Sequence, residues 1–398
     1  MASSYLPPMN APFPEIRLRR GEGRRLRLGH PWVFSNEVAE GLKGLQPGAV
    51  VQVVDHRGAP LGVGTANPHS LICVRLFTRG RRPLDGDLLA GRLRQARAVR
   101  DGLHLGDTYR WVHSEGDRLP GLVVDRYDDG IVAQTLTAGV DRLWPELLPL
   151  LVELATPAWV VLRGDSPMRA FEGLAPRVEV AHGELPAAPV VDEGGIAYRF
   201  DPIGGQKTGF FLDQRDNRSR WAGLCVGEPC LDLFCHTGGF ALAAAASGAA
   251  EVVAVDRSEP ALALAAESAA ANRLAGRLRF ERADAFTFLE QEQRRWGRIN
   301  LDPPAFIKSR KRIREGVAGY ERLHLLALRR LAPGGLLMSS SCSHHLDLPT
   351  FLQVVARAAS RAGRPMRLLA VSGAGPDHPV LPVLPESAYL KCLLLQAE

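Results

Sequence analysis

Cysteine patterns that form disulfides or bind metals are missing from this sequence of 398 residues. The six cysteines are scattered, and none belongs to a C-x-x-C pair, which argues against a disulfide framework. Cys225, Cys230 and Cys235 lie five residues apart, a spacing that suits neither a zinc knuckle nor an iron–sulfur loop. His344 and His345 have no second ligand pair in the sequence, so we expect no metal site.

Long uncharged apolar runs and a secretion signal are missing as well. The most apolar stretch, Leu143 to Leu162, contains Glu146 and Glu153, so we expect no membrane-spanning helix. Residues 1 to 15 have neither a basic start nor an apolar core, which argues against secretion. With 46% hydrophobic and 23% charged residues, a chain of this length predicts two or three globular domains, and we expect a cytoplasmic protein.

Lysine is scarce, whereas arginine is abundant. Only five of the 49 basic residues are lysines, which indicates a general compositional bias, so the position of the charge says more than its total. The net charge of +6 nevertheless favours an anionic partner. Residues 1 to 80 hold ten basic against five acidic side chains, and six arginines lie between Arg17 and Arg27. A solvated loop is the alternative interpretation of that run.

Three sequence patterns divide the chain. From Ile16 to Phe77, short apolar runs alternate with Pro-Gly, Arg-Gly and Asn-Pro turns, which predicts a small all-β domain over residues 1 to 80. Residues 81 to 190 mix helical and strand patterns and predict a central α/β domain. The elements expected there are a helix at Asp87–Leu103, strands at Trp111–Val124 and Ile131–Thr137, and a helix at Trp144–Leu154.

Regular alternation of strands and helices fills residues 191 to 398. This pattern predicts an α/β fold of parallel β-α-β units in a doubly wound sheet, with ligands at the carboxyl ends of the strands. The expected strands are Cys230–Cys235, Glu251–Val255, Leu278–Arg282, Ile299–Leu301, Gly335–Ser340, Met366–Val371 and Tyr389–Leu395. The expected helices are Phe240–Ser247, Pro260–Arg273, Phe286–Trp296, Tyr320–Leu331 and Thr350–Ala362.

Acidic residues follow the first three strands of this domain. The first strand runs into Asp232-Leu-Phe-Cys-His-Thr-Gly-Gly-Phe240, whose paired glycines let the backbone approach a ligand closely. At the end of the second strand, the carboxylate of Asp256 can accept both ribose hydroxyls of a nucleoside. The third strand runs into Asp284, which could reach an adenine edge. Helix N-capping by Asp256 and Asp284 is the alternative interpretation.

A phosphate-binding motif is missing from this domain. There is no G-x-x-x-x-G-K-[ST] sequence, and three carboxylates would repel a pyrophosphate while tolerating a cation. S-adenosylmethionine, a nucleoside with positively charged sulfonium and amino groups, therefore fits this site better than ATP or NAD.

The fourth strand ends in Asp302-Pro-Pro-Ala-Phe306. The two prolines fix φ and predict a rigid turn that aims Asp302 and Phe306 into a cleft. A carboxylate beside an aromatic ring suits an extruded nucleobase, and a core position of Phe306 is the alternative interpretation. The basic run over residues 307 to 315 follows directly, at the place where phosphates would pass.

A cysteine follows the fifth strand, in Ser339-Ser-Ser-Cys-Ser343. Because strands four and five should be neighbours, Cys342 and Asp302 are expected to face each other across one cleft. In that position Cys342 is placed for nucleophilic attack. The remaining cysteines are interpreted as buried fillers: Cys73, Cys225, Cys230, Cys235 and Cys392.

Several motifs along the chain occur together in one known family. They are Gly29-His-Pro-Trp-Val-Phe34, Asn67-Pro-His69, Glu115-Gly-Asp-Arg-Leu-Pro-Gly121, the segment Gly205 to Arg218, Asp232 to Phe240, Asp302 to Phe306, Ser341-Cys-Ser343, Asp377-His-Pro379 and Pro385 to Lys391. With these motifs the chain closely resembles, over nearly its whole length, the bacterial large-subunit ribosomal RNA cytosine-5 methyltransferases that carry an N-terminal PUA domain.

The resemblance implies a PUA barrel, a central α/β domain and a class I (Rossmann-like) methyltransferase domain, often as a homodimer. It also implies S-adenosylmethionine as cofactor, large-subunit ribosomal RNA as partner, Cys342 as nucleophile and Asp302 as the acid that contacts the base. The implied cofactor-binding residues are Asp232, Thr237, Gly238, Gly239, Asp256, Asp284 and Asp302, with the segment Gly205 to Arg218 packed beside them. The candidate RNA contacts are Phe306, Lys308, Arg310, Lys311, Arg24, Arg25, His30 and Trp32.

Two stretches depart from the family pattern. Arg298-Ile-Asn-Leu301 stands where an apolar run is usual, which affects local packing. Leu162-Arg-Gly-Asp165 stands where a Tyr-Glu-Arg-like stretch is commoner, which affects RNA contacts.

The nearest rival function is methylation of guanine N7 or N2, which uses a similar turn but needs no cysteine. A uracil C5 methyltransferase would show Asn-Pro after its cysteine. An inactive, RNA-binding ribosome-assembly factor is the rival of another class.

Overall fold

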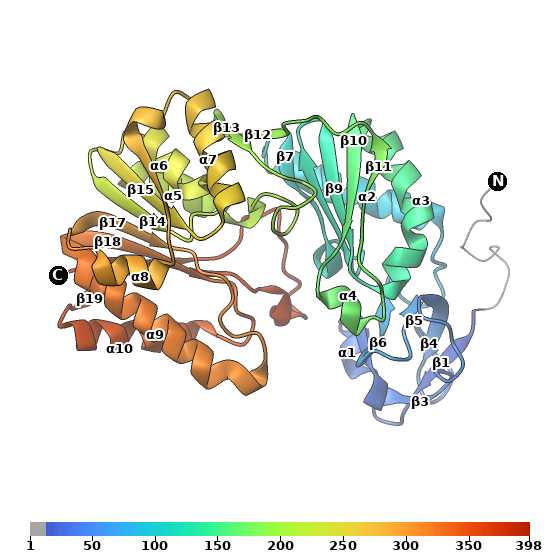
Figure 1. Cartoon of the computed structure of the whole chain (residues 1–398). Coiled ribbons are helices and arrows are strands. Elements are labelled where there is room, and N and C mark those ends of the chain that lie inside the picture. The colour runs from blue at the N-terminus through green and yellow to red at the C-terminus, as the bar shows by residue number, and fades with distance from the viewer. Residues whose placement is uncertain (1–12) are drawn as a thin grey trace. The chain divides into compact units, whose positions relative to one another are not determined.

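The computed structural model describes residues 13–398, which form two compact units (Figure 1). Unit 1 contains the chain up to Ala187 together with Asp201–Gly209 and Pro376–Ser387. Unit 2 contains Ala188–Phe200, Phe210–Gly375 and Ala388–Glu398. Residues 1 to 12 of the expected first domain lie outside the described part of the chain. The rest of that domain and residues 81–187 of the expected central domain belong to unit 1, and residues 188–190 belong to unit 2. The expected third domain departs further, because Asp201–Gly209 and Pro376–Ser387 belong to unit 1.

Unit 1 begins with a six-stranded sheet in the order β2-β6-β5-β4-β1-β3. Alternating apolar side chains such as Ile16, Val51 and Val74 fill its core. The short helices α1 (Arg24–Arg27) and η1 (Ser35–Glu37) interrupt the strands. The strands are β1 (Glu15–Leu18), β2 (Trp32–Phe34), β3 (Val38–Glu40), β4 (Ala49–Val54), β5 (Pro60–Ala66) and β6 (Ile72–Leu76).

The second sheet of unit 1 has five strands in the order β11-β10-β9-β8-β7. Helix α3 (Ala138–Ala155) connects β9 and β10, which pair in parallel, whereas the other neighbours are antiparallel. The remaining elements are α2 (Gly86–Gly102), β7 (Thr108–His113), η2 (Ser114–Asp117), β8 (Leu122–Tyr127), β9 (Gly130–Thr135), β10 (Trp159–Gly164), α4 (Met168–Phe171) and β11 (Arg177–Gly183).

A segment from late in the sequence completes unit 1. The backbone carbonyl of Asp377 accepts a hydrogen bond from the buried Arg100 guanidinium at 2.6 Å. The Asp377 carboxylate accepts another from the backbone N–H of Arg110 at 2.9 Å. Asp377 is itself 1% exposed. Residues 376–387 therefore supply buried hydrogen-bond partners to the N-terminal half of the chain.

Unit 2 is built on a seven-stranded sheet in the order β16-β15-β14-β17-β18-β20-β19. The first five strands in this order are parallel, and β20 is antiparallel to both of its neighbours. The strands are β14 (Pro229–Leu233), β15 (Glu251–Asp256), β16 (Leu278–Arg282), β17 (Trp296–Leu301), β18 (Leu331–Ser341), β19 (Met366–Ser372) and β20 (Lys391–Ala397). The hairpin of β12 (Val190–Glu193) and β13 (Ile196–Arg199) precedes the sheet.

Helices cover both faces of this sheet (Figure 1). One core, which includes Trp296, Tyr320 and Phe351, lies under α8 (Ala285–Gln291), α9 (Ile313–Arg330) and α10 (Leu348–Ala362). The other core includes Trp221 and Phe240. It lies under α5 (Arg215–Leu224), α6 (Gly239–Ala246) and α7 (Glu259–Ala271). Among residues 13–398, no helix combines the length and hydropathy that a membrane crossing requires.

Several expectations are wrong in part. The helix expected at Phe286–Trp296 ends at Gln291, and Trp296 begins β17. The strand expected at Trp111–Val124 is two strands, because η2 turns the chain between β7 and β8. The helix expected from Tyr320 begins seven residues earlier at Ile313, so the basic run enters a helix. The sheet is not wholly parallel, because β19 and β20 form an antiparallel end. The expected neighbouring positions of the fourth and fifth strands, β17 and β18, are confirmed.

Candidate active site

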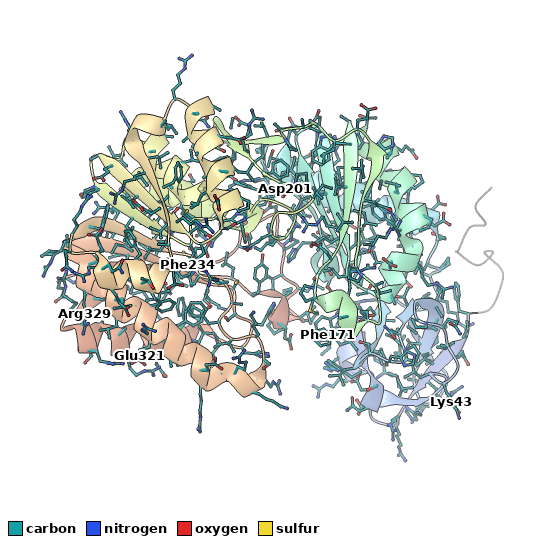
Figure 2. All side chains as sticks on the ribbon, viewed as in Figure 1. Lys43, Phe171, Asp201, Phe234, Glu321 and Arg329 are labelled. Atoms are coloured by element: carbon teal, nitrogen blue, oxygen red, sulfur yellow. The ribbon has the colours of Figure 1, made fainter. Side chains whose placement is uncertain are left out.

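The loop after β14 has an unusual backbone. Phe234, which is labelled in Figure 2, and His236 adopt left-handed φ values of 63° and 51°, and Gly238 follows at 78°. Side chains other than glycine rarely adopt this conformation, and such strain gathers at ligand sites. The ring of His236 contacts the ring of Phe211 edge-on, with centroids 5.1 Å apart. This contact holds the loop at the carboxyl end of β14.

Two glycines join this loop to α6. Gly238 caps the helix in the left-handed conformation, and a Cβ atom there would lie 3.1 Å from the Cβ atom of Ala265. A Cβ atom on Gly239 would lie 3.2 Å from Cδ of Arg218, which binds Glu193 through two nitrogens at 2.7 and 2.6 Å. The neighbouring Thr237 is 3% exposed. Glycine is therefore needed at position 238, both for its backbone angle and for its close packing.

Asp232 is buried at the end of β14, with 1% of its surface exposed. Its Oδ1 accepts a hydrogen bond from Nδ2 of Asn300 at 2.8 Å, whereas its Oδ2 is buried and has no partner in the described chain. Burial raises the pKa of Asp232 to about 7, the hydrogen bond from Asn300 opposes the rise, and the Asp302 carboxylate adds to it. Asn300, which breaks the expected apolar run of β17, is thus the partner of a buried carboxylate.

The other two acidic candidates lie after β15 and β16. Asp256 Oδ2 accepts from the backbone N–H of His236 at 2.9 Å, and its Oδ1 accepts from that of Ser258 at 2.8 Å. Asp256 therefore ties the second strand to the strained loop. Asp284 is the N-cap of α8, and its Oδ1 accepts hydrogen bonds from the backbone N–H groups of Phe286 and Thr287. In the structure Asp284 therefore has the helix-capping role that was the alternative to a cofactor contact.

The turn after β17 connects to the loop that carries Cys342. Asp302 is half-buried, and its backbone N–H lies 3.4 Å from the carbonyl oxygen of Leu233. At the far end of the turn, the N–H of Ile307 donates to Oγ of Ser343 at 3.3 Å. Phe306 is half-buried and packs on Tyr320, with ring centroids 4.7 Å apart. The structure thus brings Asp302 and Cys342 to the ends of neighbouring strands, and it places Phe306 partly within the core.

Cys342 is half-buried, whereas the other five cysteines are buried, which confirms their interpretation as fillers. The serines on either side are held by Tyr320, whose hydroxyl lies 2.9 Å from Oγ of Ser341 and 3.0 Å from Oγ of Ser343. Nζ of Lys391 donates to the carbonyl of Ser343 at 2.8 Å. Burial lowers the pKa of Lys391, and its interaction with Cys342 opposes that change. The Lys391 side chain is therefore hydrogen-bonded to the residue that follows Cys342.

The short helix η3 (Leu212–Gln214), which precedes α5, and Tyr389 support this loop. The hydroxyl of Tyr389 donates to Oδ2 of Asp213 at 2.6 Å, and the Tyr389 carbonyl accepts from Nζ of Lys391 at 2.7 Å. The Asp213 carbonyl accepts from the N–H of Gly375 at 3.2 Å. The part of the segment Gly205 to Arg218 that belongs to unit 2 thus supports the cysteine loop. Sequence reasoning assigned no role to Tyr320, Ser343, Lys391 or Asn300.

The basic candidates are mostly solvent-exposed. Lys308, Arg310 and Lys311 are exposed in the turn before α9. In unit 1, Arg24 is exposed in α1, and Arg25 binds Glu37 at 2.8 Å.

The two aromatic candidates of unit 1 have structural partners. His30 is 6% exposed, and its Nδ1 accepts from the N–H of Trp32 at 3.2 Å. Burial lowers the pKa of His30. Nε1 of Trp32 donates to Glu115 at 2.8 Å. Hydrogen bonds between these side chains and other parts of unit 1 fix the orientation of both rings.

Comparison with known proteins agrees with this geometry. Residues 16–79 match the model of a PUA-like domain, and residues 151–395 match that of an S-adenosylmethionine-dependent methyltransferase. The chain belongs to the S-adenosylmethionine-dependent methyltransferases. This methyltransferase is 39% identical over 390 residues to the ribosomal RNA large subunit methyltransferase I of Shewanella frigidimarina, covering 95% of this chain and 98% of that protein. It is 37% identical over 393 residues to the protein of the same name from Tolumonas auensis, covering 96% and 99%.

Solved structures share the fold. A SAM-dependent methyltransferase from Streptococcus mutans matches with a TM-score of 0.82 at 20% identity, covering 96% of this chain and 99% of that one. A methyltransferase complexed with SAH matches with a TM-score of 0.83 at 20% identity and the same coverage. The expected fold class, a PUA-like β domain followed by a Rossmann-like methyltransferase fold, is confirmed.

The cofactor is S-adenosylmethionine, and the residues of unit 2 fit it. The buried, unpartnered Oδ2 of Asp232 is an acceptor without a donor, which suits a ligand with positive groups. Gly238 and Gly239 have no side chains, so a ligand can approach the backbone of this loop closely. Asp256 and Asp284 supply two further half-buried carboxylates at adjacent strand ends. Among residues 13–398, no three His, Cys, Asp or Glu side chains are grouped as a metal site would require.

Proposed function

We propose that this methyltransferase modifies C5 of a cytosine in large-subunit ribosomal RNA through a covalent Cys342 adduct. Relatives named ribosomal RNA large subunit methyltransferase I, which match nearly the whole chain, support the RNA substrate. The observation that carries the choice of base and atom is Cys342, the single cysteine of the described chain that is not buried. It follows β18, and Asp302 follows the neighbouring strand β17.

The chemistry of cytosine explains why a thiol is needed. C5 of cytosine is too weak a nucleophile to accept a methyl group directly. Addition of the Cys342 thiolate to C6, with Asp302 donating a hydrogen bond or proton at N3, makes C5 enamine-like. S-adenosylmethionine supplies an electrophilic methyl group when bound. Loss of the C5 proton and cleavage of the C6–S bond then restore the aromatic ring and release the thiol.

The surroundings of Cys342 suit this role. Lys391 is bonded to the neighbouring Ser343 carbonyl and interacts electrostatically with Cys342, and a positive charge there favours the thiolate, which is the reactive form. Tyr320 and Ser343 hold the loop through buried hydrogen bonds, so the sulfur has a defined direction. The half-buried position leaves the sulfur accessible to a base extruded from its stack.

The two rival functions make different use of these groups. A guanine N7 or N2 methyltransferase would retain full turnover without the Cys342 thiol. An inactive assembly factor would bind RNA but not S-adenosylmethionine, so a calorimetric titration with the cofactor separates it from an enzyme. The buried Oδ2 of Asp232, which has no donor in the described chain, favours an enzyme with a working cofactor site.

A trapping experiment tests the proposal. Large-subunit ribosomal RNA fragments that contain 5-fluorocytosine cannot lose a proton from C5, so the native enzyme should form an adduct that resists denaturation. Mass spectrometry should map the adduct to Cys342, with the five buried cysteines as internal controls. Cys342→Ala should bind cofactor and RNA normally but lose turnover. Full methylation by this variant, or an adduct on another cysteine, would contradict the mechanism.

A further inference from the structure

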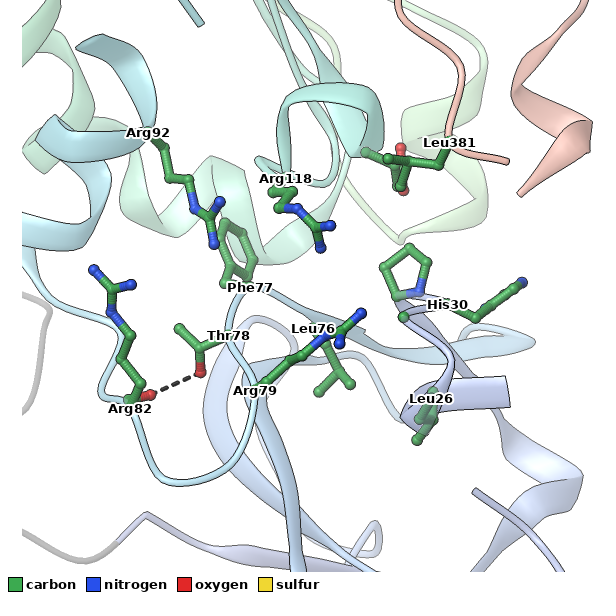
Figure 3. A pocket seen from close by; sticks show the side chains of 13 residues that line it. Leu26, His30, Leu76, Phe77, Thr78, Arg79, Arg82, Arg92, Arg118 and Leu381 are labelled. Atoms are coloured by element: carbon green, nitrogen blue, oxygen red, sulfur yellow. Dashed lines mark hydrogen bonds between the residues drawn. The ribbon is translucent and has the colours of Figure 1, made fainter. Parts of the chain in front are cut away.

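Unit 1 contains a cavity of about 270 Å³ that includes none of the candidate catalytic or cofactor-binding residues, although His30, a candidate RNA contact, lines it (Figure 3). A water molecule occupies roughly 30 Å³ in the liquid, so a larger group has room here. Four arginines line the cavity, and they come from three places in unit 1. Arg79 and Arg82 belong to the segment between β6 and α2, Arg92 to α2, and Arg118 to the turn after η2.

The positive charge of the cavity is not neutralised by the protein. Glu115 is the one carboxylate in the lining, and its oxygens accept from Nε1 of Trp32 at 2.8 Å and from Oγ of Ser114. Within residues 13–398, none of the four arginines forms an ion pair with a carboxylate. Nearby Arg75, in contrast, binds Glu172 at 2.8 Å.

Arg92 is the least satisfied of the four. Its Nε atom is buried and has no hydrogen-bond partner within the described chain. Burial lowers its pKa, and the positive charges of Arg118 and Arg82 lower it further. A buried donor without an acceptor and a cation beside two cations both raise the free energy of the empty cavity.

Backbone features hold the guanidinium groups in place. Gly29 has a φ of +105°, and a Cβ atom there would lie 2.1 Å from Nη2 of Arg79, so any other residue would displace that guanidinium group. Arg118 has a left-handed φ of 57°, which is uncommon for a residue other than glycine. Oγ1 of Thr78 donates to the Arg82 carbonyl at 2.7 Å and fixes the loop between them (Figure 3). These features restrict the backbone conformation around the cavity and position the arginines that line it.

We propose that this cavity binds a phosphate group, which in the RNA substrate is a backbone phosphate held by unit 1 outside the active site. Guanidinium groups match phosphate oxygens in bidentate geometry, and a dianion or diester would satisfy the Nε–H donor of Arg92 and offset the repulsion among the arginines. The assignment to RNA rests on the proposed function, whereas binding of phosphate by the cavity does not.

The first experiment uses inorganic phosphate and the full-length protein. Phosphate at millimolar concentration should raise the Tm of the native protein by roughly 2 to 4 °C relative to chloride at equal ionic strength. Arg92→Met and Arg118→Gln should lose this response. Arg94→Met, an exposed position on the same helix, should retain it. Without phosphate, Arg92→Met should melt at a higher temperature than the native protein, because it removes the unpaired cation but keeps the apolar stem.

The second experiment measures binding of large-subunit ribosomal RNA fragments as a function of salt. Loss of one phosphate contact should reduce the slope of log K against log salt concentration by about 1 in Arg92→Met, and Arg94→Met should keep the native slope. Calorimetry should show unchanged S-adenosylmethionine affinity in all variants, since the substitutions lie in unit 1.

The outcomes separate the possibilities. If phosphate stabilises native protein and both cavity variants equally, the cavity is no phosphate site and the proposal is overturned. If the variants lose the phosphate response but keep the native salt slope, the phosphate comes from a free ligand and the RNA assignment is wrong. If the native protein fails to bind ribosomal RNA, the proposed function fails, while the phosphate titration still decides the cavity.

Discussion

The buried carboxylate of Asp232 should make the stability of unit 2 fall as pH rises, and Asp232→Asn should remove that dependence. Its pKa lies at about 7 in the folded protein and at 3.8 ordinarily. At about 1.4 kcal/mol per pKa unit, this rise corresponds to about 4 kcal/mol. Because the folded-state pKa is raised, the associated stability is fully present below pH 4 and is lost as the pH rises through about 7.

The comparison of the two proteins isolates this effect. Between pH 5 and pH 8 the unfolding free energy of Asp232→Asn should gain about 2.5 kcal/mol on that of the native protein. Asparagine keeps the shape of the side chain and an acceptor for Nδ2 of Asn300, so the fold should persist. The exposed Asp216→Asn removes the same formal charge and corrects for net charge alone. Urea denaturation at four pH values measures the free energies.

Two results would refute this reasoning. A free-energy difference between Asp232→Asn and native protein that stays constant from pH 5 to pH 8 would mean that burial does not perturb the carboxyl group. A native protein that gains stability over this range relative to the variant would reverse the sign. Cofactor affinity gives a second measurement, because a positively charged ligand beside this carboxylate should bind more tightly as the pH rises through about 7.

Two further substitutions test the glycine turn and the cysteine loop. Gly238→Ala should destabilise the protein by about 1 to 2 kcal/mol and weaken cofactor binding, because φ is +78° and Ala265 lies close. Gly223→Ala, in a helix with open space around it, is the control and should be neutral or slightly stabilising in urea denaturation. Lys391→Met should slow adduct formation about tenfold, or about 1.4 kcal/mol, and move its pH profile to higher pH. The exposed Lys43→Met should leave the profile unchanged, and an equal loss of rate at every pH would indicate a purely structural role for Lys391.

The order of strands and helices in unit 2 was predictable because each element carries its own apolar period. The strand at Leu278–Arg282 is confirmed to the residue, and most other elements differ at their ends by a few positions. The helix from Ile313 was harder to predict because its first turn is mostly polar and shows no period. The break between β7 and β8 depends on the left-handed backbone conformations of Ser114 and Arg118, which no local sequence pattern predicts.

Pairing between distant residues explains what sequence reasoning missed. Asn300 looked like an interruption of a buried strand, and its partner Asp232 is 68 residues away. Tyr320 and Lys391 reach the cysteine loop from α9 and β20, so their roles depend on the folded sheet. The four arginines of the cavity are spread from residue 79 to 118, in a sequence where arginine is too common for any one of them to stand out.

The hydrogen bonds of Asp377 have a consequence for how this protein is made. During synthesis, residues 210–375 of unit 2 leave the ribosome before the segment that Arg100 and Arg110 require. Unit 1 therefore cannot finish folding as an N-terminal domain, although domains usually fold in the order of their synthesis. A fragment that stops at residue 187 would lose the two Asp377 acceptors of these buried hydrogen bonds, so we expect such a truncation to destabilise unit 1.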